Sequence, residues 1–140
     1  MNLNAHDKTS LSNLRMAKAR EFLDDAKANL DDARVKTAVN RSYYAVLSAA
    51  RSVLILEGAN PETHEGTITM LSLRFVKPAI LPVELIKKFK ILLSRRTDGD
   101  YGDFETISTA DAEDSVRLAT DMIDQIDGVR LELIEGMLNE

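Results

Sequence analysis

Residues 34–57 carry two stripes at helical spacing, and this double pattern constrains the fold more than any other segment. One stripe is apolar and suits the core of a helical domain: Val39, Tyr43, Val46, Ala50 and Val53. The other, called the polar stripe below, follows intervals of three, four and three: Arg41, Tyr44, Ser48 and Arg51. A helix in a small domain needs only one apolar stripe to hold it in the fold. The polar stripe is therefore the best candidate for a working surface.

The remaining segments also have helical patterns and are joined by short connections. Apolar residues recur every three or four positions, and no strand-like alternation stands out. We predict helices over residues 12–31, 34–57, 64–75 and 82–96, and a last helix after Ser108. Gly58 provides a stop, Thr63 a cap, Pro78 a break, and Ser108 with Asp111 a capping pair. The predicted fold class is all-α, an antiparallel up-and-down bundle of four to five helices.

These elements predict a simple domain organisation. Residues 1–11 are expected to form a flexible tail, residues 12–127 the helical bundle, and residues 128–140 a helical extension. Residues 97–107 contain two glycines and three aspartates and are expected to form an ordered loop. The pattern leaves open whether the last helix continues through Gly128 or restarts there.

Charge and composition narrow the class of protein. The net charge of −5 hides an asymmetry, because residues 98–140 carry 13 acids and 2 bases, whereas residues 1–97 carry 16 bases and 10 acids. Nucleic-acid affinity comes largely from phosphate neutralisation, so only a local basic patch on the first two-thirds could provide it. The chain has no cysteine, no signal-like apolar segment and no run long enough to cross a bilayer. We expect a cytoplasmic protein without membrane contact.

Several kinds of chemistry are excluded or weakly supported. The two histidines, His6 and His64, are far apart, and the chain has no HExxH, EF-hand, glycine-rich phosphate loop or GxSxG motif. We therefore expect no metal and no cofactor. Adjacent residues on a helix point about 100° apart, so the pairs Asp24–Asp25 and Asp31–Asp32 are interpreted as solvated charges. His64 is interpreted first as a residue that orders the loop before its helix.

The polar stripe itself has two interpretations. It could meet a neighbouring helix, including one from a second copy, through hydrogen bonds and arginine stacking. It could instead bind phosphate, with Arg41 and Arg51 as charge donors and the Tyr44 phenol stacking on a base or donating to an oxygen. The residue pattern alone favours neither.

Three segments resemble a known family. Residues 38–51 resemble the characteristic helix of HEPN domains, and more narrowly the stand-alone UPF0332 type. Residues 63–66, Thr-His-Glu-Gly, are similar to the start of the family's third helix. Arg96 followed by residues 100–104 is similar to the family's arginine and "ADYGD" segment, with Gly99 where alanine is usual. The resemblance covers about residues 16–126.

The resemblance implies a fold, partners and an activity. HEPN domains are four- or five-helix bundles that usually form homodimers. Many are metal-independent endoribonucleases, including toxins of toxin–antitoxin pairs, and their partner is often a minimal nucleotidyltransferase. The ribonuclease motif is an arginine followed, after four to six intervening residues, by a histidine. The arginine corresponds to Arg41, and Ser48 stands where the histidine is expected.

Ser48 decides which function we expect. RNA cleavage by 2′-hydroxyl attack needs a group that exchanges protons near neutral pH, and a serine hydroxyl does so only when another group activates it. His64 could replace the imidazole only if its helix brings it to the polar stripe. We therefore expect a nucleotide- or RNA-associated binding module. The alternatives are an endoribonuclease toxin that uses Arg41 with a substitute base, and a purely structural dimerisation protein.

The site residues follow from the stripe and the resemblance. Arg41 and Ser48 hold the motif positions. The expected binding residues are Asn40, Arg41, Tyr44, Arg51, His64, Arg96, Asp100 and Tyr101. Tyr101 resembles a tyrosine that the partner nucleotidylates in some toxins of the family. Its other interpretation is a ring that packs and hydrogen-bonds to hold its segment in place.

Overall fold

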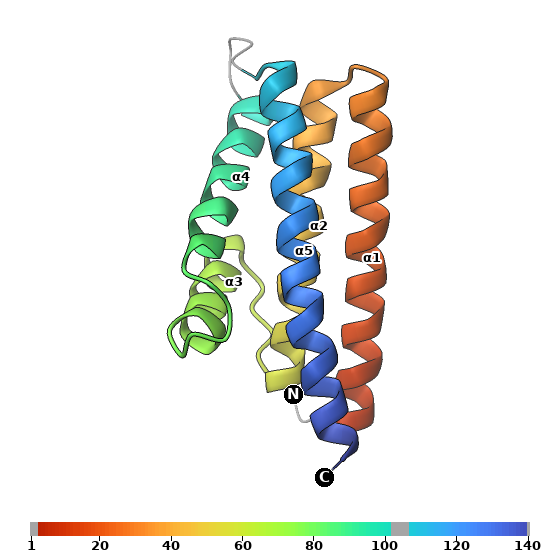
Figure 1. The fold of residues 1–140 in the computed structure, drawn as a ribbon, viewed down its shortest axis with the longest axis vertical. Coiled ribbons are helices and arrows are strands. Elements are labelled where there is room, and N and C mark those ends of the chain that lie inside the picture. Colours follow the sequence, from red (N-terminus) through yellow and green to blue (C-terminus); the bar gives the residue numbers. More distant parts are fainter. Residues whose placement is uncertain (1–2, 102–106, 140) are drawn as a thin grey trace.

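The chain forms a helical bundle, as the sequence predicts (Figure 1). The structure is a computed structural model that describes residues 3–101 and 107–139. The elements are α1 (Ala5–Asp31), α2 (Val35–Leu54), the 3₁₀ helix η1 (Ile55–Glu57), α3 (His64–Leu71), the π-helical turn η2 (Ser72–Val76), α4 (Glu84–Tyr101) and α5 (Thr109–Leu138). Helices α1 and α4 run in one direction and α2 and α5 in the other, so the up-and-down prediction is confirmed (Figure 1).

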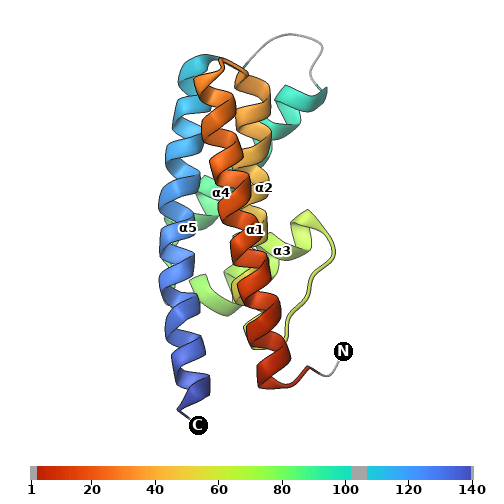
Figure 2. The ribbon, with the colours of Figure 1, turned by 90° about the vertical axis from the view of Figure 1, so that its right-hand side faces the viewer.

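Helix α2 is the central element of the bundle. It packs against α1, α4 and α5, and α1, α2 and α5 lie side by side in both views (Figures 1 and 2). The predicted apolar stripe of α2 is fully buried, from Val39 to Val53. Between residues 40 and 54, the positions that retain exposure are Asn40, Arg41, Tyr44, Ser48 and Arg51. The polar stripe is thus the open side of an otherwise enclosed helix.

Two helices are longer than predicted. Helix α1 begins at Ala5 rather than Ser12, because the Asn4 side chain caps it by accepting a hydrogen bond from Asp7 N at 2.8 Å. Helix α4 continues to Tyr101, so the expected loop over residues 97–107 is wrong in its first half. The Thr97 hydroxyl donates to Leu93 O at 2.9 Å within the helix, and Arg96 pairs with Asp100 one turn later at 3.1 Å. Residues 102–106 lie outside the described residues.

The helix ends agree with several local predictions. Gly58 adopts a left-handed φ of 78° after η1, and Thr63 caps α3. Ser108 and Asp111 form the predicted capping box. Helix α5 continues unbroken through Gly128 to Leu138, which answers the open question about its end. A Cβ on Gly128 would have no contact within 4 Å, so this glycine lies on an open helix surface and does not mark a break.

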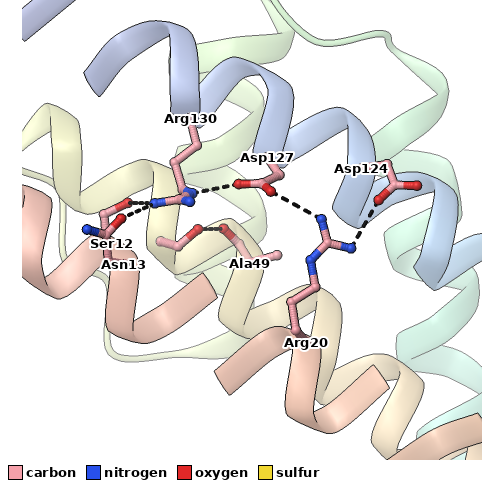
Figure 3. A network of polar contacts seen from close by, with 8 residues as sticks. Ser12, Asn13, Arg20, Ala49, Asp124, Asp127 and Arg130 are labelled. Carbon is pink, nitrogen blue, oxygen red and sulfur yellow. Dashed lines mark hydrogen bonds and ion pairs between the residues drawn. The ribbon is translucent and has the colours of Figure 1, made fainter. Parts of the chain in front are cut away.

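A buried polar network fixes α5 against α1 (Figure 3). Arg130, only 6% exposed, donates to Ser12 Oγ at 3.3 Å, to Asn13 Oδ1 at 2.7 Å and to Asp127 Oδ1 at 2.8 Å. Asp127 also accepts from Arg20, whose second nitrogen pairs with Asp124 (Figure 3). The network sets the position of α1, which supplies one wall of the site described next.

Candidate functional site

A cleft of about 530 Å³ opens between α1, α2 and the start of α3. Three members of the polar stripe, Tyr44, Ser48 and Arg51, form its α2 side. The full lining is Arg15, Lys18, Phe22, Tyr44, Leu47, Ser48, Arg51, Glu62, Thr63, His64 and Thr67. The polar stripe therefore lines a real concavity, and α1 and α3 complete it.

The cleft carries an excess of positive charge. Arg15, Lys18 and Arg51 line it together with one acid, Glu62, and none of the three cations makes an ion pair with a residue that the structure describes. Burial, and secondly the neighbouring charge of Arg51, lower the pKa of Arg15. Arg51 Nε is buried without a hydrogen-bond partner among the described residues. Such like charges at close range favour an anionic occupant.

Arg15 and Ser48 join α1 to α2 at the cleft wall. The Ser48 hydroxyl donates to Arg15 O at 2.8 Å. The Arg15 guanidinium in turn donates to Arg51 O at 3.3 Å and to Asn60 Oδ1 at 3.0 Å. Because the Ser48 proton is committed to a main-chain oxygen, this hydroxyl acts here as a link between helices.

His64 reaches the polar stripe from the first turn of α3. Its ring centroid lies 5.4 Å from that of Tyr43 and 6.0 Å from that of Tyr44. Burial, then the charges of Arg96 and Arg51, lower the pKa of His64, so the neutral imidazole is favoured. Helix α3 thus brings an imidazole to the polar stripe, as a substitute for the motif histidine would require.

The N-terminal cap of α3 explains why threonine and glycine occupy the first and last positions of the Thr-His-Glu-Gly segment. Thr63 Oγ1 accepts from Gly66 N at 2.9 Å. A Cβ at position 66 would lie 2.7 Å from this oxygen, closer than real Cβ contacts allow. Glycine at this position therefore lets the cap close and hold His64 at the cleft.

Arg41 lies outside the cleft, in a neighbouring hollow of about 360 Å³. Phe22 and Lys18 line both spaces, so Phe22 lies on the boundary between them. Arg41 donates to Asp25 Oδ2 at 2.8 Å, and its guanidinium carbon lies 5.8 Å from the Phe22 ring centre. The charge of Arg41 is thus partly offset by Asp25, unlike that of Arg51.

A second polar chain joins the remaining predicted residues. Arg41 donates to Asn40 Oδ1 at 3.2 Å, and Asn40 donates to Asp100 Oδ2 at 3.0 Å. Asp100 pairs with Arg96, which donates to the Tyr44 hydroxyl at 3.0 Å and lies over the Tyr44 ring. The structure therefore brings the α4 residues to the polar stripe. Tyr101 ends α4, and its side chain lies outside what the structure describes.

The α1 side of the cleft is absent from the sequence predictions. Arg15, Lys18 and Phe22 follow intervals of three and four, so they share one face of α1 beside its apolar stripe. This spacing is the signal that could have found them. Taken alone, this spacing is also typical of an ordinary solvated helix face. Only the packing of α1 against α2 shows that these three side chains line a cleft.

Comparison with known proteins agrees with this architecture. The HEPN domain family matches residues 12–129. The chain belongs to the HEPN domain family. A UPF0332 protein of Thermotoga maritima is 33% identical over 120 residues, covering 86% of this chain and 88% of the relative. This HEPN chain is therefore of the UPF0332 type, as the sequence motifs predicted.

One further relative and one solved structure extend the HEPN comparison. The Methanocaldococcus jannaschii protein named "Putative toxin MJ0605" is 38% identical over 58 residues, 41% of this chain and 43% of the relative. The crystal structure of TT1696 from Thermus thermophilus superimposes with a TM-score of 0.74 at 17% identity, covering 84% of this chain and 97% of TT1696. The latter likeness supports the HEPN fold alone.

The described residues of this HEPN chain include neither a metal-binding cluster nor a membrane-spanning helix. No group of three or more His, Cys, Asp and Glu side chains there is arranged to hold a metal ion. Among the same residues, no helix is both long and apolar enough to span a membrane.

Proposed function

We propose that this HEPN chain is a binding module whose cleft takes a phosphate-bearing ligand, a nucleotide or a segment of RNA. The observation that carries the proposal is the group of three cations, Arg15, Lys18 and Arg51, without an ion-pair partner among the described residues. Arginine suits phosphate because its planar fork gives two charge-assisted hydrogen bonds. Binding of a 5′-phosphorylated oligonucleotide, with and without Arg51, tests the proposal.

The rest of the lining fits the other part of such a ligand. Phe22 and Tyr44 both line the cleft, and their ring centroids are 6.1 Å apart. Stacking of a base on an aromatic ring contributes about 1–3 kcal/mol per base and tolerates any base. A volume of about 530 Å³ also lies within the usual range of small-molecule sites. Cations for phosphate beside rings for a base support a nucleotide ligand.

The proposal extends to partners. The HEPN resemblance implies a homodimer and a minimal nucleotidyltransferase partner, in a pair of the toxin–antitoxin kind. A relative carrying the word toxin in its name is consistent with such a pair. We propose that the chain acts in the cytoplasm as a homodimer paired with a minimal nucleotidyltransferase. Its cleft would bind the nucleotide or RNA on which the pair acts.

The titration of His64 provides a test within the cleft. Binding a phosphate beside Arg51 and His64 should raise the lowered pKa of His64, because the anion opposes the effect of the cations. Ligand binding is then coupled to the uptake of a proton by His64. The affinity should rise as pH falls below the bound-state pKa of His64, by up to about tenfold for each pH unit until the free-state pKa is reached. NMR titration of the imidazole, in a His6→Gln background, measures both states.

The ligand-free chain should respond to acid in the opposite sense. Since the folded-state pKa of His64 lies below its unfolded value, the unfolded chain takes up the proton first. The His64 contribution to stability is present above about pH 6.5 and is lost as pH falls through the folded-state pKa. The His64→Asn variant should lack both pH effects. An affinity profile unchanged by His64→Asn would contradict the placement of the anion at this imidazole.

The position of His64 also favours a second candidate, the endoribonuclease. An imidazole beside Tyr44 and Arg51 could take the proton of a 2′-hydroxyl, whose oxygen bonds to the adjacent phosphorus and displaces the 5′-oxygen of the next nucleotide, which takes up a proton. A cation of the cleft would stabilise the negative charge that develops on the non-bridging phosphate oxygens. This candidate predicts that the chain cleaves single-stranded RNA without metal. The His64→Ala variant should then lose about 100- to 10,000-fold in rate.

Matched variants separate the ribonuclease from the binding module. Ser48→Ala should change the cleavage rate little, because the Ser48 proton is donated to Arg15 O. Growth arrest and RNA cleavage are compared for the wild type, Arg41→Ala, His64→Ala and Ser48→Ala. RNA binding without cleavage in the wild type rejects the ribonuclease and leaves the binding module. Absence of both binding and cleavage leaves the purely structural alternative.

A further inference from the structure

Arg96 on α4 contacts the aromatic wall of the cationic cleft without lining the cleft itself. Its Nη2 donates a hydrogen bond to the Tyr44 hydroxyl at 3.0 Å. Its guanidinium carbon lies 5.5 Å from the centre of the Tyr44 ring and 5.8 Å from that of the Tyr43 ring. The Arg96 side chain is only 15% exposed, and a cation removed from water binds an aromatic face more strongly than one at the surface. Arg96 therefore holds the Tyr44 ring from the side of α4.

A fixed anchor sets the orientation of the Arg96 guanidinium. Arg96 Nε pairs with Asp100 Oδ2 at 3.1 Å, and the same oxygen accepts a hydrogen bond from Asn40 Nδ2 at 3.0 Å. Asn40 lies on α2 one turn before Tyr44, so the anchor and the ring that Arg96 contacts are held by the same helix. A guanidinium is a rigid planar fork, so pairing one nitrogen with Asp100 also directs the nitrogen that donates to Tyr44. A lysine ammonium at this position lacks that geometry.

The Tyr44 ring connects the other aromatic side chains of the cleft. Its centroid lies 6.1 Å from that of Phe22 on α1 and 6.0 Å from that of His64 on α3, and all three residues line the cleft. The His64 ring meets the Tyr44 ring edge-on, at an interplanar angle of 84°. A shift of Tyr44 would thus disturb contacts with two other helices, so the position of this ring determines the shape of the aromatic wall.

The hydrogen bond from Arg96 also leaves the Tyr44 proton available to a ligand. The phenol oxygen accepts from Arg96, and an arginine side chain has no acceptor for the phenol proton. Within residues 3–101 and 107–139, no other hydrogen bond of the Tyr44 hydroxyl is present. This hydroxyl can therefore donate to an oxygen of a nucleoside in the cleft while the ring stacks on its base.

We infer that Arg96 is a positioning residue of the cationic cleft, which holds the ring and the hydroxyl of Tyr44 in place for a nucleotide. Arg96 acts through Tyr44 and does not touch the ligand, whereas the cations of the lining contact the phosphate. The inference rests on the proposed ligand binding and adds a role for a residue outside the lining. It requires that loss of Arg96 weakens the binding of a ligand that carries a base and spares the binding of a base-free phosphate.

Isothermal titration calorimetry of the full chain compares a 5′-phosphorylated dinucleotide with pyrophosphate, which has no base. Arg96→Gln should weaken dinucleotide binding about five- to tenfold, part of the contribution of stacking on one ring, and change pyrophosphate binding less than about twofold. Arg96→Lys should lose as much dinucleotide affinity, since the ammonium keeps the charge and lacks the fork. The control is Lys90→Gln, which removes an exposed charge from the same helix outside the cleft and should bind both ligands as the wild type does.

A double-mutant cycle tests whether Arg96 acts through Tyr44. Tyr44→Phe keeps the ring and removes the hydroxyl to which Arg96 donates. In this background the loss of dinucleotide affinity caused by Arg96→Gln should be smaller than in the wild type by about threefold, because the effects of contacting residues are not additive. Losses that simply multiply would overturn the inference. Equal losses for dinucleotide and pyrophosphate would overturn it too, as would full dinucleotide affinity in either Arg96 variant.

NMR of the ligand-free chain separates this inference from the proposed ligand binding. Nuclear Overhauser contacts between the Tyr44 and His64 rings should weaken in Arg96→Gln. Asp100→Asn alters only the anchor, so it should cause the same change to a smaller extent, and it replaces Arg96→Gln if that variant does not fold. A wild type that binds neither ligand rejects the proposed function. Ring contacts that persist unchanged in both variants overturn the positioning role, whether or not the wild type binds.

Discussion

The Arg130→Ala variant is expected to lose about 2–3 kcal/mol of unfolding free energy, because removing one member of a buried ion pair leaves the other uncompensated. Arg130 is 6% exposed and is hydrogen-bonded to Ser12, Asn13 and Asp127. The figure is below the usual range for a fully buried pair because the Asp127 side chain keeps 19% exposure and a second partner, Arg20. Urea denaturation followed by circular dichroism measures the change.

Arg117 offers a matched control on the same helix. It pairs with Asp114 three residues earlier, as Arg130 does with Asp127, but its side chain is 66% exposed. Exposed pairs contribute little, so Arg117→Ala should stay within about 0.5 kcal/mol of the wild type. Equal, small losses in the two variants would show that the network of Figure 3 does not hold α1 against α5.

The second large effect is expected at Arg51. Arg51→Gln should reduce the affinity for a 5′-phosphorylated oligonucleotide by about 10- to 100-fold, since a hydrogen bond to a charged group contributes about 1.5–3 kcal/mol. The physical reason is that Arg51 lines the cleft and has no ion-pair partner among the described residues, so its charge is available to the phosphate. Isothermal titration calorimetry at fixed ionic strength gives the affinity.

Two other arginines separate a local effect from a general loss of charge. Arg74 is exposed on η2 and outside the cleft, so Arg74→Gln should change the affinity little. Arg41 is paired with Asp25 in the neighbouring hollow, so Arg41→Gln should have a smaller effect than Arg51→Gln. An equal loss in all three variants would indicate diffuse electrostatic attraction in place of a site.

The local part of the fold was predictable from the sequence. The two stripes of α2 depend only on the 3.6-residue period, and the structure buries the apolar stripe and leaves the polar one open. The caps at Thr63 and Ser108 likewise depend on a few neighbouring residues. Such features follow from the sequence because they need no knowledge of tertiary contacts.

The end of α4 was not predictable in the same way. Gly99 and the aspartates of residues 98–103 have the composition of a loop, yet the helix continues to Tyr101. Asp100 bonds to Arg96 one turn earlier and to Asn40 across the bundle, so partners on two helices favour the helical conformation. Tertiary contact here outweighs weak local propensity.

Only the α2 side of the candidate site could be predicted from the sequence. The polar stripe indicated the α2 wall of the cleft. The sequence alone did not predict that the cleft is also lined by Arg15, Lys18 and Phe22, because this depends on how α1 packs beside α2. The resemblance directed attention to Arg41 and Ser48, whereas the structure pairs Arg41 with Asp25 and ties Ser48 to α1. The position of His64 depends on how the loop after Gly58 folds back, which no periodicity encodes. These placements support binding in the cleft formed with Arg51.

The most direct test of the cationic cleft is a ¹H–¹⁵N NMR titration of the full chain with a 5′-phosphorylated dinucleotide. We expect saturable shifts confined to the lining segments 15–22, 44–51 and 62–67, together with the His64 imidazole. Shifts that saturate at another surface, or no saturable shifts, would contradict binding in the cleft.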